Sequence, residues 1–315
     1  MLASFFGKSK PINYVLLSAL LFIGFLAAIF KGSIPFSSPP EILTALSLLL
    51  LLIFSLLLLD FVIRKNNLTG KNTYGILFFT LFIIQLPVIH ESPQIIWAML
   101  CLMLATRRFL SLNSDINIEK KILDASFYIA IAGLFFPWCW LFFGVLFLSI
   151  LLHTAVQLRY LIIPVIGVLV VFILKTTYHF LVDDGFEWFF TPWFEMSFSF
   201  GAYNSLGILI TALLVALFIL WMGTMRLIRI PSLPKKERSR AWLMLIVLVF
   251  TLFMAVLGDV KTGAELLLPV FPLAIISANF LEVNEGSGRA KPFDFWFKEL
   301  LMWFLLLISL VLLIV

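Results

Sequence analysis

The stretch that decides the fold lies at residues 42–62, where the sequence is ILTALSLLLLLIFSLLLLDFV. Asp60 is the only charged residue in this run and lies close to its end. A helix needs about 20 apolar residues to cross the hydrocarbon core of a bilayer. Residues 42–62 therefore predict a transmembrane helix.

The composition of the whole chain agrees with a lipid environment. Of its 315 residues, 63% are hydrophobic and 12% are charged, whereas soluble domains carry about 25% charged residues. A water-soluble protein of this length could not bury so much apolar surface in one core. The two cysteines, Cys101 and Cys139, lie inside apolar runs without metal-ligand spacing, so we expect both to be buried.

Apolar runs of spanning length recur along the chain. The clear candidates are residues 14–30, 42–62, 74–89, 160–173, 206–225, 242–257, 264–281 and 300–315. Two regions are ambiguous, because 93–106 is short for one crossing and 124–152 is too long for one and contains Pro137. We interpret the first run, which follows Lys8 and Lys10, as an uncleaved first helix.

Positive charges resolve the ambiguous regions, because Lys and Arg are retained on the cytoplasmic side of the inner membrane. Two hairpins, one turning at residues 90–93 and one at 137–140, place the basic loops on one side. Of the 22 Lys and Arg residues, all but Lys31, Lys175 and Lys261 are then cytoplasmic.

The predicted fold is therefore all-α, a polytopic transmembrane helix bundle that forms a single domain over residues 1–315. We expect about 11 spans with short central hairpins, the N-terminus in the cytoplasm and the C-terminus in the periplasm.

The longest exterior segment, residues 176–205, is rich in Phe and Trp. Aromatic side chains favour the membrane–water interface, so we expect one or two short helices on the outer leaflet. Within this region His179 and Asp183 follow Lys175 at intervals of four residues, which is typical of one helical face.

The candidate site residues are the polar groups of this exterior side. They are Glu41, His90, Glu91, His179, Asp183 and Asp184. A histidine and carboxylates near an interface could act as a general base, or hold a divalent cation with a pyrophosphate. The alternative interpretation is a solvated rim of paired charges. No other cofactor is indicated.

Several function classes find no support in the sequence. It contains no P-loop, Gly-x-Ser-x-Gly, His-Glu-x-x-His or dinucleotide-binding motif. Topology and anionic lipid headgroups explain the basic loop 226–240, so no nucleic-acid partner is expected. Ion-coupled transporters usually carry ionisable groups near the bilayer midplane, and the predicted spans have none, which places a transporter third among the hypotheses.

Three short stretches carry a family resemblance. They are NNLTGKN at 66–72, LATRR at 104–108 and DASF at 124–127. They resemble an uncharacterised family of bacterial polytopic inner-membrane proteins, known mainly from flavobacteria, and the resemblance covers most of the chain. It implies a Gram-negative inner membrane and no established activity.

The order of the predicted helices carries a second resemblance, which is architectural. Short paired helices, a basic cytoplasmic loop and a hairpin at 131–152 resemble the core of C-type glycosyltransferases, which use polyprenyl-phosphate sugars. In those enzymes an aspartate of the first exterior loop serves as base. The corresponding loop of this chain, 31–41, offers only Glu41.

Two hypotheses follow, and the sequence does not decide whether the protein is an enzyme. The first is a cell-envelope biogenesis protein that handles a lipid-linked, polyprenyl-type substrate, such as a linked glycan, at the outer leaflet. The second is a non-catalytic structural subunit of a membrane protein complex, with membrane lipids and other membrane proteins as its partners. Detergent purification distinguishes them by a bound polyprenyl lipid or a stoichiometric protein partner.

Overall fold

The computed structural model describes residues 2–112, 116–153, 157–182, 196–258, 261–282 and 292–314. Over these ranges the chain is helical and has no β-strand, which confirms the predicted all-α class. The α-helices are α1 (Leu2–Phe6), α2 (Pro11–Phe30), α3 (Pro39–Asn66), α4 (Tyr74–Ile84), α5 (Pro93–Ser111), α6 (Ile118–Phe135), α7 (Phe142–His153), α8 (Leu158–Val182), α9 (Leu206–Arg229), α10 (Lys235–Leu257), α11 (Leu267–Glu282) and α12 (Pro292–Ile314). Short 3₁₀ helices connect several of them: η1 (Pro87–Glu91), η3 (Pro137–Leu141), η5 (Gly201–Asn204), η6 (Ile230–Ser232) and η7 (Ala264–Leu266).

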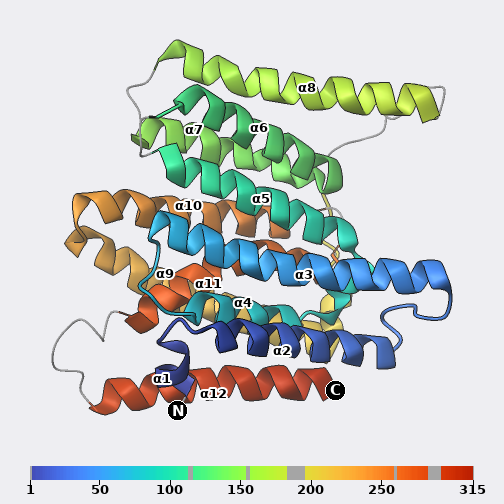
Figure 1. The fold of residues 1–315 in the computed structure, drawn as a ribbon, viewed down its shortest axis with the longest axis vertical. Coiled ribbons are helices and arrows are strands. Elements are labelled where there is room, and N and C mark those ends of the chain that lie inside the picture. Colours follow the sequence, from blue (N-terminus) through green and yellow to red (C-terminus); the bar gives the residue numbers. More distant parts are fainter. Residues whose placement is uncertain are drawn as a thin grey trace.

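Two buried helices, α4 and α11, form the core of the bundle. Every residue of α4 is buried, and α11 is buried except at Phe280 and Glu282. The two helices contact each other; α4 also contacts α2, α3 and α12, and α11 also contacts α5, α9 and α10. In Figure 1 the longer helices lie side by side around this centre, with α8 at one edge and α12 at the other. Helices that are apolar on all sides are expected at such buried positions.

The ends of the longest helix follow from its sequence. Ser38 and Glu41 form a capping box at the start of α3, and Pro39 occupies its first turn. The helix runs for 28 residues, about 42 Å at 1.5 Å per residue. It stops at Asn67, which adopts the left-handed conformation with φ of 47°.

Prolines break the chain at both predicted hairpins. Pro87 begins η1 and Pro137 begins η3, so α4 ends at Ile84 and α6 ends at Phe135. A proline has no N–H to donate and its ring clashes with the carbonyl four residues earlier, which explains why neither helix continues. The predicted span 74–89 is therefore too long at its C-terminal end.

Helix lengths support a multi-pass membrane protein. In the described part of the chain, eight helices are long and apolar enough to cross a membrane. Two apolar helices, Tyr74–Ile84 and Pro137–Leu152, are shorter, and α6 carries four charged residues in its first two turns. Length and composition therefore do not establish the expected count of about 11 crossings.

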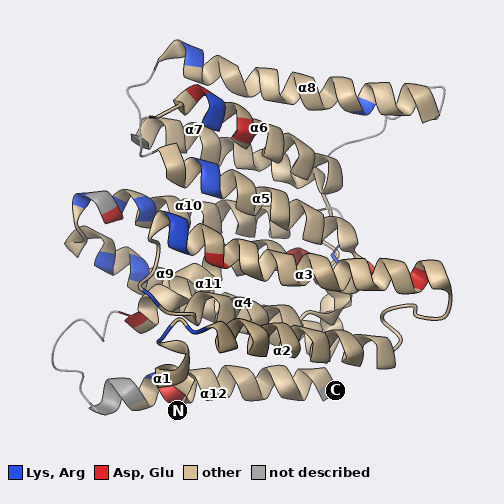
Figure 2. Ribbon diagram, in the orientation of Figure 1, with Lys and Arg blue, Asp and Glu red and all other residues tan. Residues whose placement is uncertain are grey.

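The basic side chains gather at one end of the bundle. Figure 2 shows most Lys and Arg positions at the left-hand helix ends. Several of them form ion pairs. Arg64 lies 2.7 Å from Asp60 within α3, Arg108 of α5 lies 2.6 Å from Asp124 of α6, and Arg159 of α8 lies 2.8 Å from Glu119 of α6. We call the bundle end formed by these residues the basic end, and the other end the opposite end.

Candidate functional site

A cavity of about 430 Å³ opens at the basic end, between α9, α10, α11 and the loop that follows α3. Its polar lining residues are Asn67, Thr69, Arg226, Glu237, Arg240, Asn279 and Glu282. Its apolar lining residues are Leu68, Leu233, Ala241, Met244, Ile275 and Ile276. The cavity therefore combines charged and apolar walls, as a site for an amphiphilic ligand requires.

Helix termini explain why charges collect at this cavity. Arg226 lies in the last turn of α9, where the negative end of the helix dipole stabilises a cation. Glu237 lies in the first turn of α10, where the positive end stabilises an anion. Pro231 and Pro234 lie in the short connection between these helices, so the two termini face the same solvent-accessible region.

The two arginines of the cavity differ from the other arginines of the described chain. Arg64, Arg108 and Arg159 each have a carboxylate partner. Arg107 lies over the ring of Phe61, Arg229 lies over Phe280, and Arg238 donates to the backbone oxygens of Pro231 and Leu233. In the described ranges, Arg226 and Arg240 alone have neither a hydrogen bond, nor an ion pair within 4 Å, nor an aromatic ring as partner.

A carboxylate fixes one wall of the cavity. Oε1 of Glu282 accepts a hydrogen bond of 2.9 Å from the backbone N–H of Gly70 and another from the side-chain amide of Asn72. These bonds tie the loop after α3 to the C-terminal end of α11. Glu282 therefore holds a negative charge at the edge of the cavity in a defined position.

Glu41, a predicted site residue, serves as a helix cap. Its Oε2 accepts hydrogen bonds from the backbone N–H groups of Ser37 at 2.9 Å and Ser38 at 3.1 Å. These donors begin α3 and would otherwise lack helical partners. The carboxylate of Glu41 therefore stabilises the N-terminus of α3 at the opposite end.

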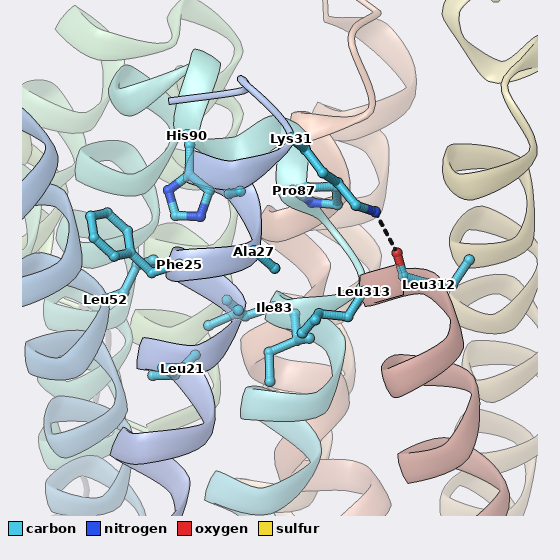
Figure 3. Close-up of a pocket in the computed structure, with 13 residues that line it drawn as sticks. Leu21, Phe25, Ala27, Lys31, Leu52, Ile83, Pro87, His90, Leu312 and Leu313 are labelled. Carbon is cyan, nitrogen blue, oxygen red and sulfur yellow. Dashed lines mark hydrogen bonds between the residues drawn. The ribbon is translucent and has the colours of Figure 1, made fainter. Parts of the chain in front are cut away.

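His90 lies in η1 beside a small cavity that is also lined by Lys31 (Figure 3). The imidazole packs edge-to-face against Phe25 with ring centroids 5.9 Å apart, and its Nδ1 is buried without a hydrogen-bond partner. Burial lowers the pKa of His90 to about 4. The cavity volume of about 20 Å³ holds one water molecule and no larger ligand.

The remaining predicted site residues do not meet at this cavity. Glu91 is exposed directly after His90, and His179 lies on α8, which continues through Val182. Asp183 and Asp184 lie outside the described residues, as does the rest of the middle of the predicted interfacial segment, residues 183–195. No group of three or more His, Cys, Asp and Glu side chains that could hold a metal ion is found among the residues described.

A buried polar cluster at the opposite end was not predicted. Tyr203 donates a hydrogen bond of 2.8 Å to Glu265, whose carboxylate is fully buried. Nearby, Nζ of Lys261 is buried and donates to the backbone oxygens of Ala255 at 2.7 Å and Val256 at 2.6 Å. The sequence places Lys261 and Glu265 in one short loop, but their burial depends on η5, which lies far away in the chain.

The comparisons with known proteins give a family and no activity. No curated protein and no solved structure matches the chain. One family model covers residues 9–315, nearly the whole chain, and it is described as a family of unknown function. This agrees with the predicted membership of an uncharacterised family. The chain therefore belongs to the family of unknown function DUF6427.

Proposed function

We propose that the protein is a multi-pass protein of the bacterial inner membrane that binds a lipid-linked, phosphate-bearing substrate of the polyprenyl type during cell-envelope biogenesis. The observation that carries this proposal is the basic-end cavity, in which Arg226 and Arg240, without a hydrogen bond or close ion pair among the described residues, lie beside apolar walls. Guanidinium groups bind phosphate oxygens in charge-assisted, often bidentate hydrogen bonds. The apolar walls would contact the first part of the lipid chain.

The proposed orientation places the basic end in the cytoplasm, with the N-terminus there and the C-terminus in the periplasm. Support comes from the clustering of Lys and Arg at one bundle end, because such residues are retained on the cytoplasmic side. The lipid phosphate would then bind from the cytoplasmic leaflet. The sequence-based hypothesis placed the lipid-linked substrate at the outer leaflet instead. Binding there would require a site that includes Asp183 and Asp184.

A cysteine-labelling experiment tests this orientation. Ser37→Cys marks the opposite end, Ser232→Cys marks the basic end, and both positions are exposed. The native Cys101 and Cys139 are buried, so background labelling is expected to be low. A membrane-impermeant maleimide should label S37C on spheroplasts and S232C only after permeabilisation. The reverse pattern would contradict the orientation.

A lipid-binding experiment tests the function. The protein in mild detergent should bind undecaprenyl phosphate more tightly than undecaprenol, which lacks the phosphate. Arg226→Gln and Arg240→Gln should each weaken binding roughly tenfold, as expected for loss of a charge-assisted hydrogen bond. Arg159→Gln is the matched control, because Arg159 pairs with Glu119 away from the cavity.

Two further comparisons separate the sources of phosphate. Inorganic phosphate that competes as strongly as the lipid would indicate a site for a soluble anion, and phosphatidylglycerol that binds equally well would indicate a general lipid site. Either result would overturn the polyprenyl assignment. Equal binding of undecaprenol, or no effect of the arginine substitutions, would overturn the phosphate site.

The second candidate function is a non-catalytic subunit of a membrane complex. It is favoured by α8, which lies at the edge of the bundle and has exposed apolar side chains around most of its circumference. A protein partner or lipid could cover that surface. Recovery of a stoichiometric membrane protein with the purified chain, without bound polyprenyl lipid, would favour the subunit.

A further inference from the structure

Among the described residues, the charges that line the basic-end cavity are balanced. Arg226 and Arg240 provide two positive charges, and Glu237 and Glu282 provide two negative charges. A cavity that served only to bind highly charged anions would gain by lacking carboxylates, since like charges at close range repel. The two carboxylates therefore influence which anions the cavity binds.

Glu282 is the better placed of the two carboxylates to influence a ligand. Hydrogen bonds from Gly70 and Asn72 fix its position, and it is only half-exposed. Glu237 is exposed in the first turn of α10, where water and salt screen its charge. Among the charged neighbours of Arg226, Glu282 attracts the guanidinium most strongly, followed by Glu237.

A phosphate that binds Arg226 therefore also approaches the carboxylate of Glu282. The first negative charge of a ligand gains hydrogen bonds from the guanidinium group, which offset this repulsion. Each additional negative charge meets the same carboxylate, while the described lining residues still include two arginines. The binding free energy gained per negative charge therefore becomes smaller as the charge of the headgroup rises.

We propose that Glu282 determines the specificity of this cavity and makes it prefer a lipid with one phosphate group over the corresponding diphosphate. This inference rests on the proposed function and names the charge class of its substrate. Polyprenyl monophosphates and polyprenyl phosphodiesters belong to the preferred class.

The test compares undecaprenyl phosphate with undecaprenyl diphosphate, in the same detergent and salt. Wild type should bind the monophosphate more tightly. Glu282→Gln removes the charge but keeps an oxygen that can accept from Gly70 and Asn72. It should tighten binding of the diphosphate roughly threefold to tenfold and that of the monophosphate by less.

Two controls accompany this variant. Glu237→Gln should change the preference less than Glu282→Gln, because Glu237 is exposed. Glu119→Gln should leave the preference unchanged, since Glu119 pairs with Arg159 outside the cavity. An unchanged ratio of the two affinities in Glu282→Gln, or weaker binding of both lipids, would overturn the inference. Wild type that binds neither lipid would instead overturn the proposed function.

A measurement on wild type alone keeps the inference testable if Glu282→Gln does not fold. A phosphate monoester gains a second negative charge near pH 6, whereas its methyl diester keeps a single charge. Between pH 5 and about pH 8 the monoester should lose affinity relative to the methyl diester. A constant or rising relative affinity would overturn the inference.

Discussion

The hydroxyl group of Tyr203 donates a hydrogen bond of 2.8 Å to Oε1 of Glu265, and this bond joins the beginnings of two neighbouring helices. Tyr203 lies in η5 before α9, and Glu265 lies in η7 before α11. The backbone N–H of Gly263 donates to the other carboxylate oxygen at 2.8 Å. Because Glu265 has no exposed surface, the loss of a donor is expected to be costly.

Replacing Tyr203 with Phe should therefore destabilise the protein. The variant leaves a buried carboxylate with one donor fewer, which costs about 1–3 kcal/mol. Thermal unfolding in detergent, followed by circular dichroism, should show a lower midpoint than wild type. Tyr178→Phe is the matched control because Tyr178 is 61% exposed on α8. Equal midpoints for Y203F and Y178F would contradict the stabilising role.

The same bond predicts sensitivity to alkali. Burial and the charge of Glu265 raise the pKa of Tyr203 above its ordinary value of 10.0. The unfolded chain therefore loses this proton at a lower pH than the folded protein, so the contribution of Tyr203 is complete below about pH 10 and declines as pH rises above that value. Unfolding midpoints of wild type should fall faster above pH 10 than those of Y203F. Parallel pH curves would argue against this assignment.

Acid should destabilise the protein through His90. The pKa of His90 is lowered from 6.5 to about 4 by burial, so below pH 6.5 the unfolded chain binds a proton that the folded protein excludes. Stability is expected to decline as pH falls through this interval, by at most about 3 kcal/mol. Lys31 lines the same cavity as His90, and Glu91 is the next residue in the chain.

Stability curves of His90→Gln test this assignment. The variant should lose less stability than wild type between pH 6.5 and about 4. His179→Gln on α8 is the control for loss of a histidine elsewhere. If H90Q and wild type show the same acid dependence in denaturant titrations, His90 is not the group responsible.

Much of the fold could be predicted because apolar run length and Lys/Arg placement act locally along the sequence. The turn at Pro137 is an example, since a proline disrupts a helix whatever surrounds it. The end of α4 at Ile84 was not predicted. Apolar residues continue past it, so a hydropathy profile does not show where the helix ends.

The candidate cavity could not be predicted for a different reason. Its lining comes from the loop after α3 and from α9, α10 and α11, which lie far apart in the sequence. The positive charge of loop 226–240 was noted in the sequence, but membrane topology was enough to explain it, so no binding site was predicted there. What distinguishes Arg226 and Arg240 is that neither makes a hydrogen bond or a close ion pair with the described residues, and only tertiary packing reveals this. The burial of Glu265 was hidden in the same way, because Tyr203 reaches it from another helix.

A polar contact between α4 and α12 should stabilise the bundle. The side-chain amide of Gln85 donates to Oγ of Ser309 at 2.8 Å, and both residues are buried. Ser309→Ala should lower the free energy of unfolding by about 0.5–1.5 kcal/mol, the range typical of interhelical hydrogen bonds in membranes. Ser47→Ala is the control, since Ser47 donates only within α3 and is exposed. Equal stability of S309A and S47A in a denaturant titration would contradict this role.

The packing of α8 depends on Gly167. A Cβ atom added there would lie 2.9 Å from Cβ of Ser126 and 3.2 Å from the backbone nitrogen of Phe127, both on α6. Small residues allow helices to approach closely in membranes, and a side chain at such a position forces them apart. Gly167→Val should therefore destabilise the protein by about 1–3 kcal/mol, as overpacking typically does, and should separate α8 from α6.

A disulfide assay measures this separation directly. Cysteines at Ser126 and at a residue of α8 one turn away from Gly167, on the same helix face, should cross-link in the wild-type background and lose cross-linking in Gly167→Val. Gly207→Ala is the control, because nothing lies within 4 Å of a Cβ added at Gly207, and the better helix propensity of Ala should leave stability unchanged or slightly raised. Undiminished cross-linking in the Gly167→Val background would show that α8 is held to α6 by contacts other than this close approach.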